Sequence, residues 1–294
     1  MPFDYVNASA VDVPEHLDFP VKYEDTKMEG QKYVINGNTD EYIGIVGSGF
    51  KCENHGDFFR KVSATMTEHL KPHEIEGAEV SWKSAYNNGM GVMDVRLPNV
   101  SAKITTTRHE TEVQQRVIAL HGVNGSCSNV AIFGAIDFFC LNGMISGEHD
   151  KVKRKNTSGF DMDAFIRRLG KSKDNFYAKT EQMQRWAVSS LVHVDVKALL
   201  ESIMKNDKQA EKMFALYREE VTTRGQNLWS LYSAFTNYAT YADERNGFKL
   251  RETGNDTQAK TMLEREYDVA RWVNTPQFRQ LVGNNSVQVI PVNA

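Results

Sequence analysis

The residues best suited to covalent chemistry lie around one histidine. Ser126 and Cys127 follow His121 closely, and a hydroxyl or thiol within reach of an imidazole is what nucleophilic catalysis needs. Neither lies in a GxSxG elbow, and glycines within 122–125 are typical of a turn between strands. Cys140, in an apolar run, is typical of a small buried residue. The sequence therefore predicts no catalytic residue, and a hydrolase that uses His121 remains a third hypothesis.

Metal and nucleotide sites are not predicted either. His69 and His73 have the spacing of two ligands on one helix face, but Pro72 ends the helix between them. No Walker-type GxxxxGK[ST] sequence occurs, and the run Gly44–Gly49 lacks the GxGxxG spacing that holds a pyrophosphate. We expect no metal and no cofactor.

Positive charge gathers in one part of the chain, where four cations occur within residues 151–155. Such a cluster can neutralise phosphates and release counterions, which is the main sequence-independent source of nucleic-acid affinity. A solvated linker is the alternative, because runs of charge are usually exposed. The predicted nucleic-acid-binding residues are Lys151, Lys153, Arg154, Lys155, Arg167, Arg168, Lys171, Lys173, Lys103, Arg108 and Arg116.

Bulk properties limit the class of protein without choosing among its functions. The 294 residues carry a formal net charge of -3, which is too small for the whole-molecule field to recruit polyanions. Three widely spaced cysteines favour neither a disulfide framework nor a zinc site. The first residues lack a signal-peptide pattern, and the most apolar window, 130–145, is too short to span a bilayer. We expect a cytoplasmic protein with no membrane partner.

The first half of the chain has strand periodicity. Residues 1–30 are acidic and predict an irregular arm, whereas residues 31–150 predict a mainly antiparallel sheet with at least one helix. The clearest local signal is alternation over residues 77–97 about Asn87 to Gly89, which predicts a β-hairpin. Further expected elements are strands at 33–35, 42–46, 114–121 and 130–139, and a helix that Asn54 caps and Pro72 stops.

The second half has helical periodicity. Residues 151–175 predict a basic connector and the start of a helix, and residues 176–294 predict a helical subdomain with a loose tail. Four stripes of period 3.6 predict that residues 160–282 are overwhelmingly helical. The expected fold class is therefore α+β, with an N-terminal antiparallel sheet followed by a helical part.

Short motifs in both halves resemble a family of phage and plasmid proteins catalogued as domain of unknown function 932. One is Ala119-Leu-His-Gly-Val-Asn-Gly-Ser-Cys127 with Phe138-Phe-Cys-Leu-Asn-Gly-Met-Ile145, and another is Asn227-Leu-Trp-Ser-Leu-Tyr-Ser-Ala-Phe-Thr-Asn-Tyr-Ala239. With the early Gly44-Ile-Val-Gly run, the resemblance extends from about residue 40 to 270. It implies mobile-element ancestry and the fold. The chain departs from the family at Asp137, where the family often has arginine.

Two classes of function fit these observations. The first is a nucleic-acid-binding protein of a phage or plasmid, such as a single-strand annealing or protecting factor in recombination or replication. Phage annealing proteins of the RecT, Redβ and Erf types likewise combine an antiparallel sheet, helices and a basic groove, use no nucleotide and form multimers, an analogy of architecture only. The second is an interaction protein that inhibits a host-defence or host enzyme. Candidate partners are accordingly single-stranded nucleic acid, further copies of the chain, or a host protein.

Overall fold

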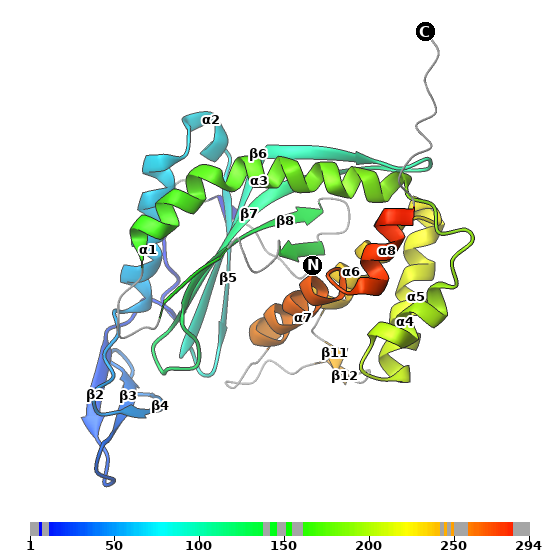
Figure 1. Cartoon of the computed structure of the whole chain (residues 1–294). Helices are drawn as coiled ribbons and strands as arrows, with labels where there is room; N and C mark the ends of the chain where they lie inside the picture. Colours follow the sequence, from blue (N-terminus) through cyan, green and yellow to red (C-terminus); the bar gives the residue numbers. More distant parts are fainter. Residues whose placement is uncertain are drawn as a thin grey trace.

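The computed structural model describes residues 6–7, 12–137, 142–145, 151–154, 161–241, 244–245, 248–249 and 258–284. Within these, a large antiparallel sheet lies at the centre, a small sheet projects from one end, and most of the helices gather at the other end (Figure 1). The expected fold class, an α+β protein with the sheet first and the helices after it, is confirmed.

The large sheet follows a simple order. Its path is β1-β5-β6-β7-β8-β10, and β9 also pairs with β8. All of these pairings are antiparallel. The strands are β1 (Val6–Asn7), β5 (Glu79–Ala85), β6 (Met90–Thr105), β7 (Glu110–Gly122), β8 (Asn129–Asp137), β9 (Asn142–Ile145) and β10 (Lys151–Arg154).

The predicted hairpin is confirmed as β5 and β6. Ala85 pairs with Met90, and the turn between them closes with a hydrogen bond from the Gly89 N–H to the Tyr86 carbonyl at 3.0 Å. Asn87 and Asn88 have φ values of 52° and 59°, in the left-handed region that asparagine tolerates better than most residues. The local sequence thus sets both the place of the turn and the register of the two strands.

The N-terminal segment corrects one expectation. Residues up to 30 were expected to be irregular, but they contain β2 (Val21–Asp25), which forms a three-stranded antiparallel sheet with β3 (Gln31–Asn36) and β4 (Tyr42–Gly47). Leu17 and Phe19 are buried just before it. No local pattern marks β2, because three of its five side chains are exposed and it gains its order from pairing with β3.

Helices cover the sheet and form the C-terminal part, as predicted for residues 160–282. A small strand pair, β11 (Glu244–Arg245) and β12 (Phe248–Lys249), lies among them. Pro72 begins a further short helix after ending the first. The helices are α1 (His55–His69), α2 (Pro72–Ile75), α3 (Met162–Val188), α4 (Val196–Ile203), α5 (Asp207–Arg224), α6 (Leu228–Thr240), α7 (Gln258–Trp272) and α8 (Pro276–Asn284).

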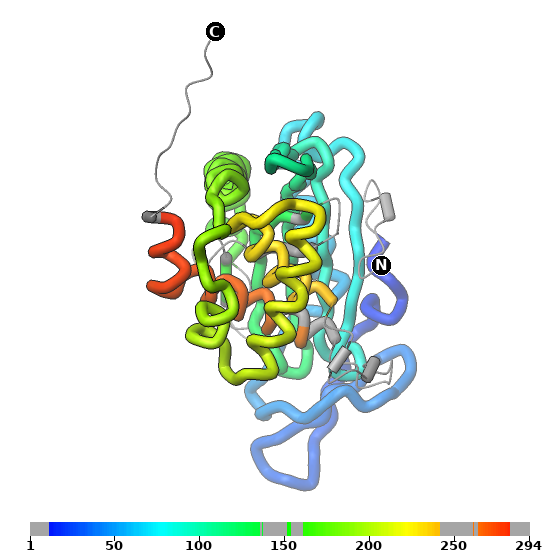
Figure 2. Tube along the Cα trace, turned by 90° about the vertical axis from the view of Figure 1, so that its right-hand side faces the viewer, coloured from blue at the N-terminus to red at the C-terminus, as the bar shows by residue number. Residues whose placement is uncertain are grey.

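Both faces of the sheet are buried. Along β7, Val117 and Ala119 belong to the main core, which continues into α1, α3 and the C-terminal helices. The alternate residues Ile118 and Leu120 belong to a second cluster on the other face. The near-continuous apolar run of β7 is what a central strand covered on both sides requires. Figure 2 shows the C-terminal helices in yellow packed beside the strands.

Candidate nucleic-acid interface

The basic tract is a strand, which corrects the expectation of a connector at residues 151–154. β10 pairs antiparallel with β8 and ends the strand order of the described sheet. Val152 pairs with Ala131 and is buried, whereas Lys153 pairs with Val130 and is exposed. Alternation of lysine with valine is a strand signal that the analysis of charge alone missed. Lysines on a sheet edge also discourage pairing with other chains.

Other residues of this tract are placed less completely. Lys151 and Arg154 are placed by backbone register, opposite Ile132 and Asn129. Lys155 lies outside the described residues.

One face of α3 packs on the sheet beside this strand. Phe165, Leu169 and Phe176 are buried, and Phe165 stacks on Phe133 of β8 with ring centroids 5.8 Å apart. Contacts of α3 reach β6, β7, β8 and β10. The helix therefore lies over the sheet as far as its basic edge.

Two polar contacts define which flank of α3 faces β6. Near the start, the Lys173 ammonium donates to Glu74 of α2 at 2.7 Å. Near the end, the Gln184 side chain both accepts from the N–H of Thr105 and donates to its carbonyl, each at 2.9 Å. Lys173 is thereby tied to α2. Burial opposes ionisation of Glu74, but the hydrogen bonds from Lys173 and the Lys71 N–H hold its pKa below the usual range.

The opposite flank of α3 carries the cations that lie toward β10. Arg168 is half-buried there and Lys171 is exposed, and the two residues are three positions apart, so they are neighbours on the helix surface. Arg167 is exposed on the side away from the sheet. Arg168, Lys171 and Lys153 are thus brought to the same part of the molecule.

Lys103 and Arg108 lie elsewhere. They flank the turn between β6 and β7, where Lys103 pairs with Glu110 at 2.7 Å and Arg108 is exposed. The contact between Gln184 and Thr105 places this turn at the far end of α3, roughly 24 Å along the helix from Arg168 at 1.5 Å per residue. The predicted cations therefore do not form one surface.

Arg116 is a correction, because it is buried with 1% exposure. Its guanidinium donates to Asp94 of β6 at 3.0 Å and to Glu266 of α7 at 2.6 Å. A phosphate cannot reach this guanidinium. Burial raises the pKa of Glu266, and attraction to Arg116 opposes that rise. The residue therefore joins the sheet to the C-terminal helices instead of binding a ligand.

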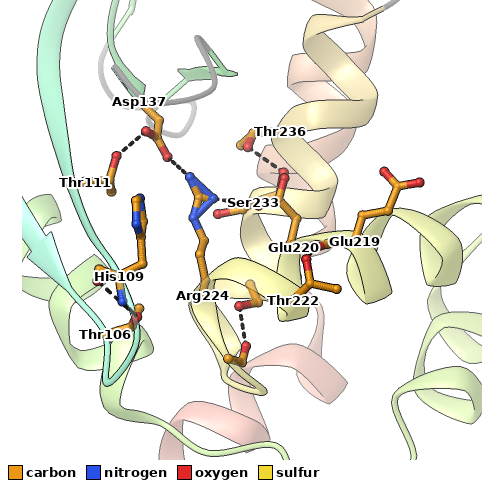
Figure 3. A network of polar contacts seen from close by, with 12 residues as sticks. Thr106, His109, Thr111, Asp137, Glu219, Glu220, Thr222, Arg224, Ser233 and Thr236 are labelled. Carbon is orange, nitrogen blue, oxygen red and sulfur yellow. Dashed lines mark hydrogen bonds and ion pairs between the residues drawn. The ribbon is translucent and has the colours of Figure 1, made fainter.

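A second buried cluster explains the position where this chain departs from its family. Asp137 of β8 accepts from the Thr111 hydroxyl at 2.5 Å and from Arg224 of α5 at 2.7 Å, as Figure 3 shows. Arg224 also donates to Glu220 at 2.6 Å. Burial raises the pKa of Glu220, opposed first by Arg224. Asp137 is therefore half of a buried ion pair between the sheet and α5, a role that no nearby sequence signal indicates.

His121 was predicted in a loop and instead lies buried in β7. Its Nδ1 is 2.9 Å from Nδ1 of His55, and Nε2 of His55 is 2.9 Å from the Asn88 carbonyl. Since a carbonyl only accepts, His55 donates from Nε2 and accepts at Nδ1 from His121. Phe58 stacks on the His121 ring. Burial lowers the pKa of both histidines, that of His55 to about 4.

The other residues considered for chemistry are placed as follows. Burial raises the pKa of Cys127 to about 11, which favours the thiol over the nucleophilic thiolate. Cys140 lies outside the described residues. In the part of the chain that the structure describes, no three His, Cys, Asp or Glu side chains are arranged to hold a metal ion. Nor does any helix among the described residues have the length and apolar character needed to cross a membrane.

Comparison with known proteins identifies the family. Residues 74–265 match the family described as Domain of unknown function (DUF932). The chain belongs to this family. No curated protein and no solved structure matches it. The matched region runs from α2 into α7, so it includes both buried arginine clusters and the basic edge, whereas the small sheet β2-β3-β4 precedes it.

Proposed function

We propose that this protein binds single-stranded nucleic acid through its phosphates, on a surface formed by β10 and the neighbouring flank of α3. Such binding suits an annealing or protecting factor of a phage or plasmid. The supporting observation is that the basic tract is an edge strand in contact with α3 rather than a loose linker. Lys153, Arg168 and Lys171 are therefore presented on rigid elements, so little conformational entropy is lost when they meet a phosphate.

The expected binding is salt-sensitive and weakly selective for sequence. Cations that contact phosphates release counterions, and such contacts carry no direct information about the bases. The slight net negative charge of the whole chain restricts affinity to this local surface.

The test is titration of labelled single-stranded and duplex oligonucleotides across a salt series. Each lost phosphate contact should reduce the slope of log affinity against log salt by about 0.7 for a single strand. The variant replaces Lys151, Lys153, Arg154 and Lys155 with Gln and should show a shallower slope. The matched control replaces Lys197, Lys205, Lys208 and Arg218, which are exposed on and beside α4 and α5, and should keep the wild-type slope.

Two results would contradict the proposal: no wild-type binding at low salt, or equal slopes for the variant and the control. The interaction-protein alternative would then take its place. One observation supports that alternative, since Met28, Tyr42 and Ile45 on the small sheet are 65%, 54% and 48% exposed, and exposed apolar groups gathered on one element often contact another protein.

A further inference from the structure

The charges of α3 are sorted by side. Its acidic residues, Asp163, Asp174 and Glu181, recur at helical spacing on the side away from the sheet. A different row follows the spacing of three and four residues that keeps side chains on one flank. That row, here named the amide-cation row, consists of Arg168, Lys171, Asn175, Lys179 and Gln182. It contains no carboxylate.

The amide-cation row lies on the β8 and β10 side of the helix. The flank that carries Lys173 and Gln184 faces α2 and β6, and the face that carries Phe165 packs on β8. The row lies across that packed face from Lys173, on the remaining flank. Its first residues are therefore beside β10, which α3 contacts.

The row has a defined end. Trp186 continues the same spacing four residues after Gln182, and its ring packs against Tyr232 of α6 and Phe278 of α8, with centroids 4.9 Å and 5.5 Å apart. The part that these helices leave uncovered extends from Arg168 to Gln182. At 1.5 Å per residue this is about 21 Å.

We infer that the amide-cation row is the track along which the sugar-phosphate backbone of one strand lies. Arginine, lysine, asparagine and glutamine are among the side chains that donate to phosphates and sugars. A single line of donors along one helix flank matches one backbone, whereas a duplex presents two. The inference rests on the proposed function and extends it, because it adds Asn175, Lys179 and Gln182, which the analysis of charge runs did not include.

The test compares two double variants in the same salt series with a labelled single-stranded oligonucleotide. Arg168→Gln with Lys179→Gln removes two cations from the row, and the slope should become shallower by about 1.4. Arg185→Gln with Arg218→Gln removes two exposed cations from other surfaces of α3 and α5, and the slope should not change. Equal slopes in the two variants would overturn the inference.

A second pair tests the row without touching a half-buried residue. Asn175→Asp and Ala178→Asp each add one negative charge at an exposed position of α3, and only the first should weaken binding at low salt, by several-fold. Circular dichroism and thermal melting establish that each variant is folded. Loss of all wild-type binding would contradict the proposed function itself. Wild-type binding that only the β10 variant weakens would leave that function standing and place the strand away from α3, as would a preference for duplex.

Discussion

Arginine occurs in two contrasting environments in this molecule. Inside, Arg116 and Arg224 are each 1% exposed and each lies between two carboxylates from different elements. At the sheet edge, Arg168 lies partly in solvent beside a lysine-bearing strand. The interior arginines join the sheet to the C-terminal helices, and the edge cations leave their charge available to a ligand. The same side chain therefore has a structural role or a binding role according to where its carboxylates lie.

The largest effect should come from breaking an interior cluster. Arg224→Met leaves Asp137 and Glu220 buried without their cation, and the free energy of unfolding should fall by about 3 to 5 kcal/mol. Urea denaturation measures this loss. Adding Asp137→Asn should recover part of it, because one buried charge is removed. Arg185→Met, at an exposed position, should cost less than about 0.5 kcal/mol. Comparable losses in the two single variants would contradict the distinction between interior and surface arginines.

The next effect concerns a buried polar pair that is neutral instead of charged. His55 and His121 have pKa values below their usual 6.5 because they are buried. The unfolded chain therefore takes up the protons first, so stability is complete above about pH 6.5 and is lost as the pH falls toward about 4. For His55 this amounts to about 3 kcal/mol across that range. Urea midpoints at several pH values measure it.

The control for this prediction is the slope of stability against pH in variants. His121→Asn should flatten it, whereas His73→Gln, at an exposed position, should not. The buried carboxyls Glu220 and Glu266 have raised pKa values and act in the opposite direction on acidification, but they are present in every protein compared. A slope that His121→Asn leaves unchanged would mean that the histidine pair does not titrate on unfolding.

The smallest effect tests whether the basic tract is a strand. Val152 is 5% exposed in the main core and Lys153 is exposed. Val152→Ala should therefore lower the free energy of unfolding by about 1 to 2 kcal/mol, whereas Lys153→Ala should change it by less than about 0.5 kcal/mol. A loose linker would give two negligible values in the same denaturation experiment.

These contrasts show what the sequence could predict. The hairpin of β5 and β6 was predictable because alternation and an Asn-Asn-Gly turn lie within one short segment. The extent of α3 was partly predictable, since its buried stripe repeats at 3.6 residues. Arg116 was not, because the partner that buries it, Glu266, is 150 residues away. Asp137 and His121 were misjudged or left open for the same reason: their partners, Arg224 and His55, lie in distant segments.

The contact between Gln184 and Thr105 sets the rotation of α3 about its own axis. Because one side-chain amide satisfies both the N–H and the carbonyl of Thr105, it takes the place of one more residue of a neighbouring strand at the end of β6. A turn of the helix by one residue, about 100°, would break both bonds. The same turn would carry acidic residues toward the flank where Arg168 now lies. A neutral amide that meets no ligand thus decides which charges the helix shows to one.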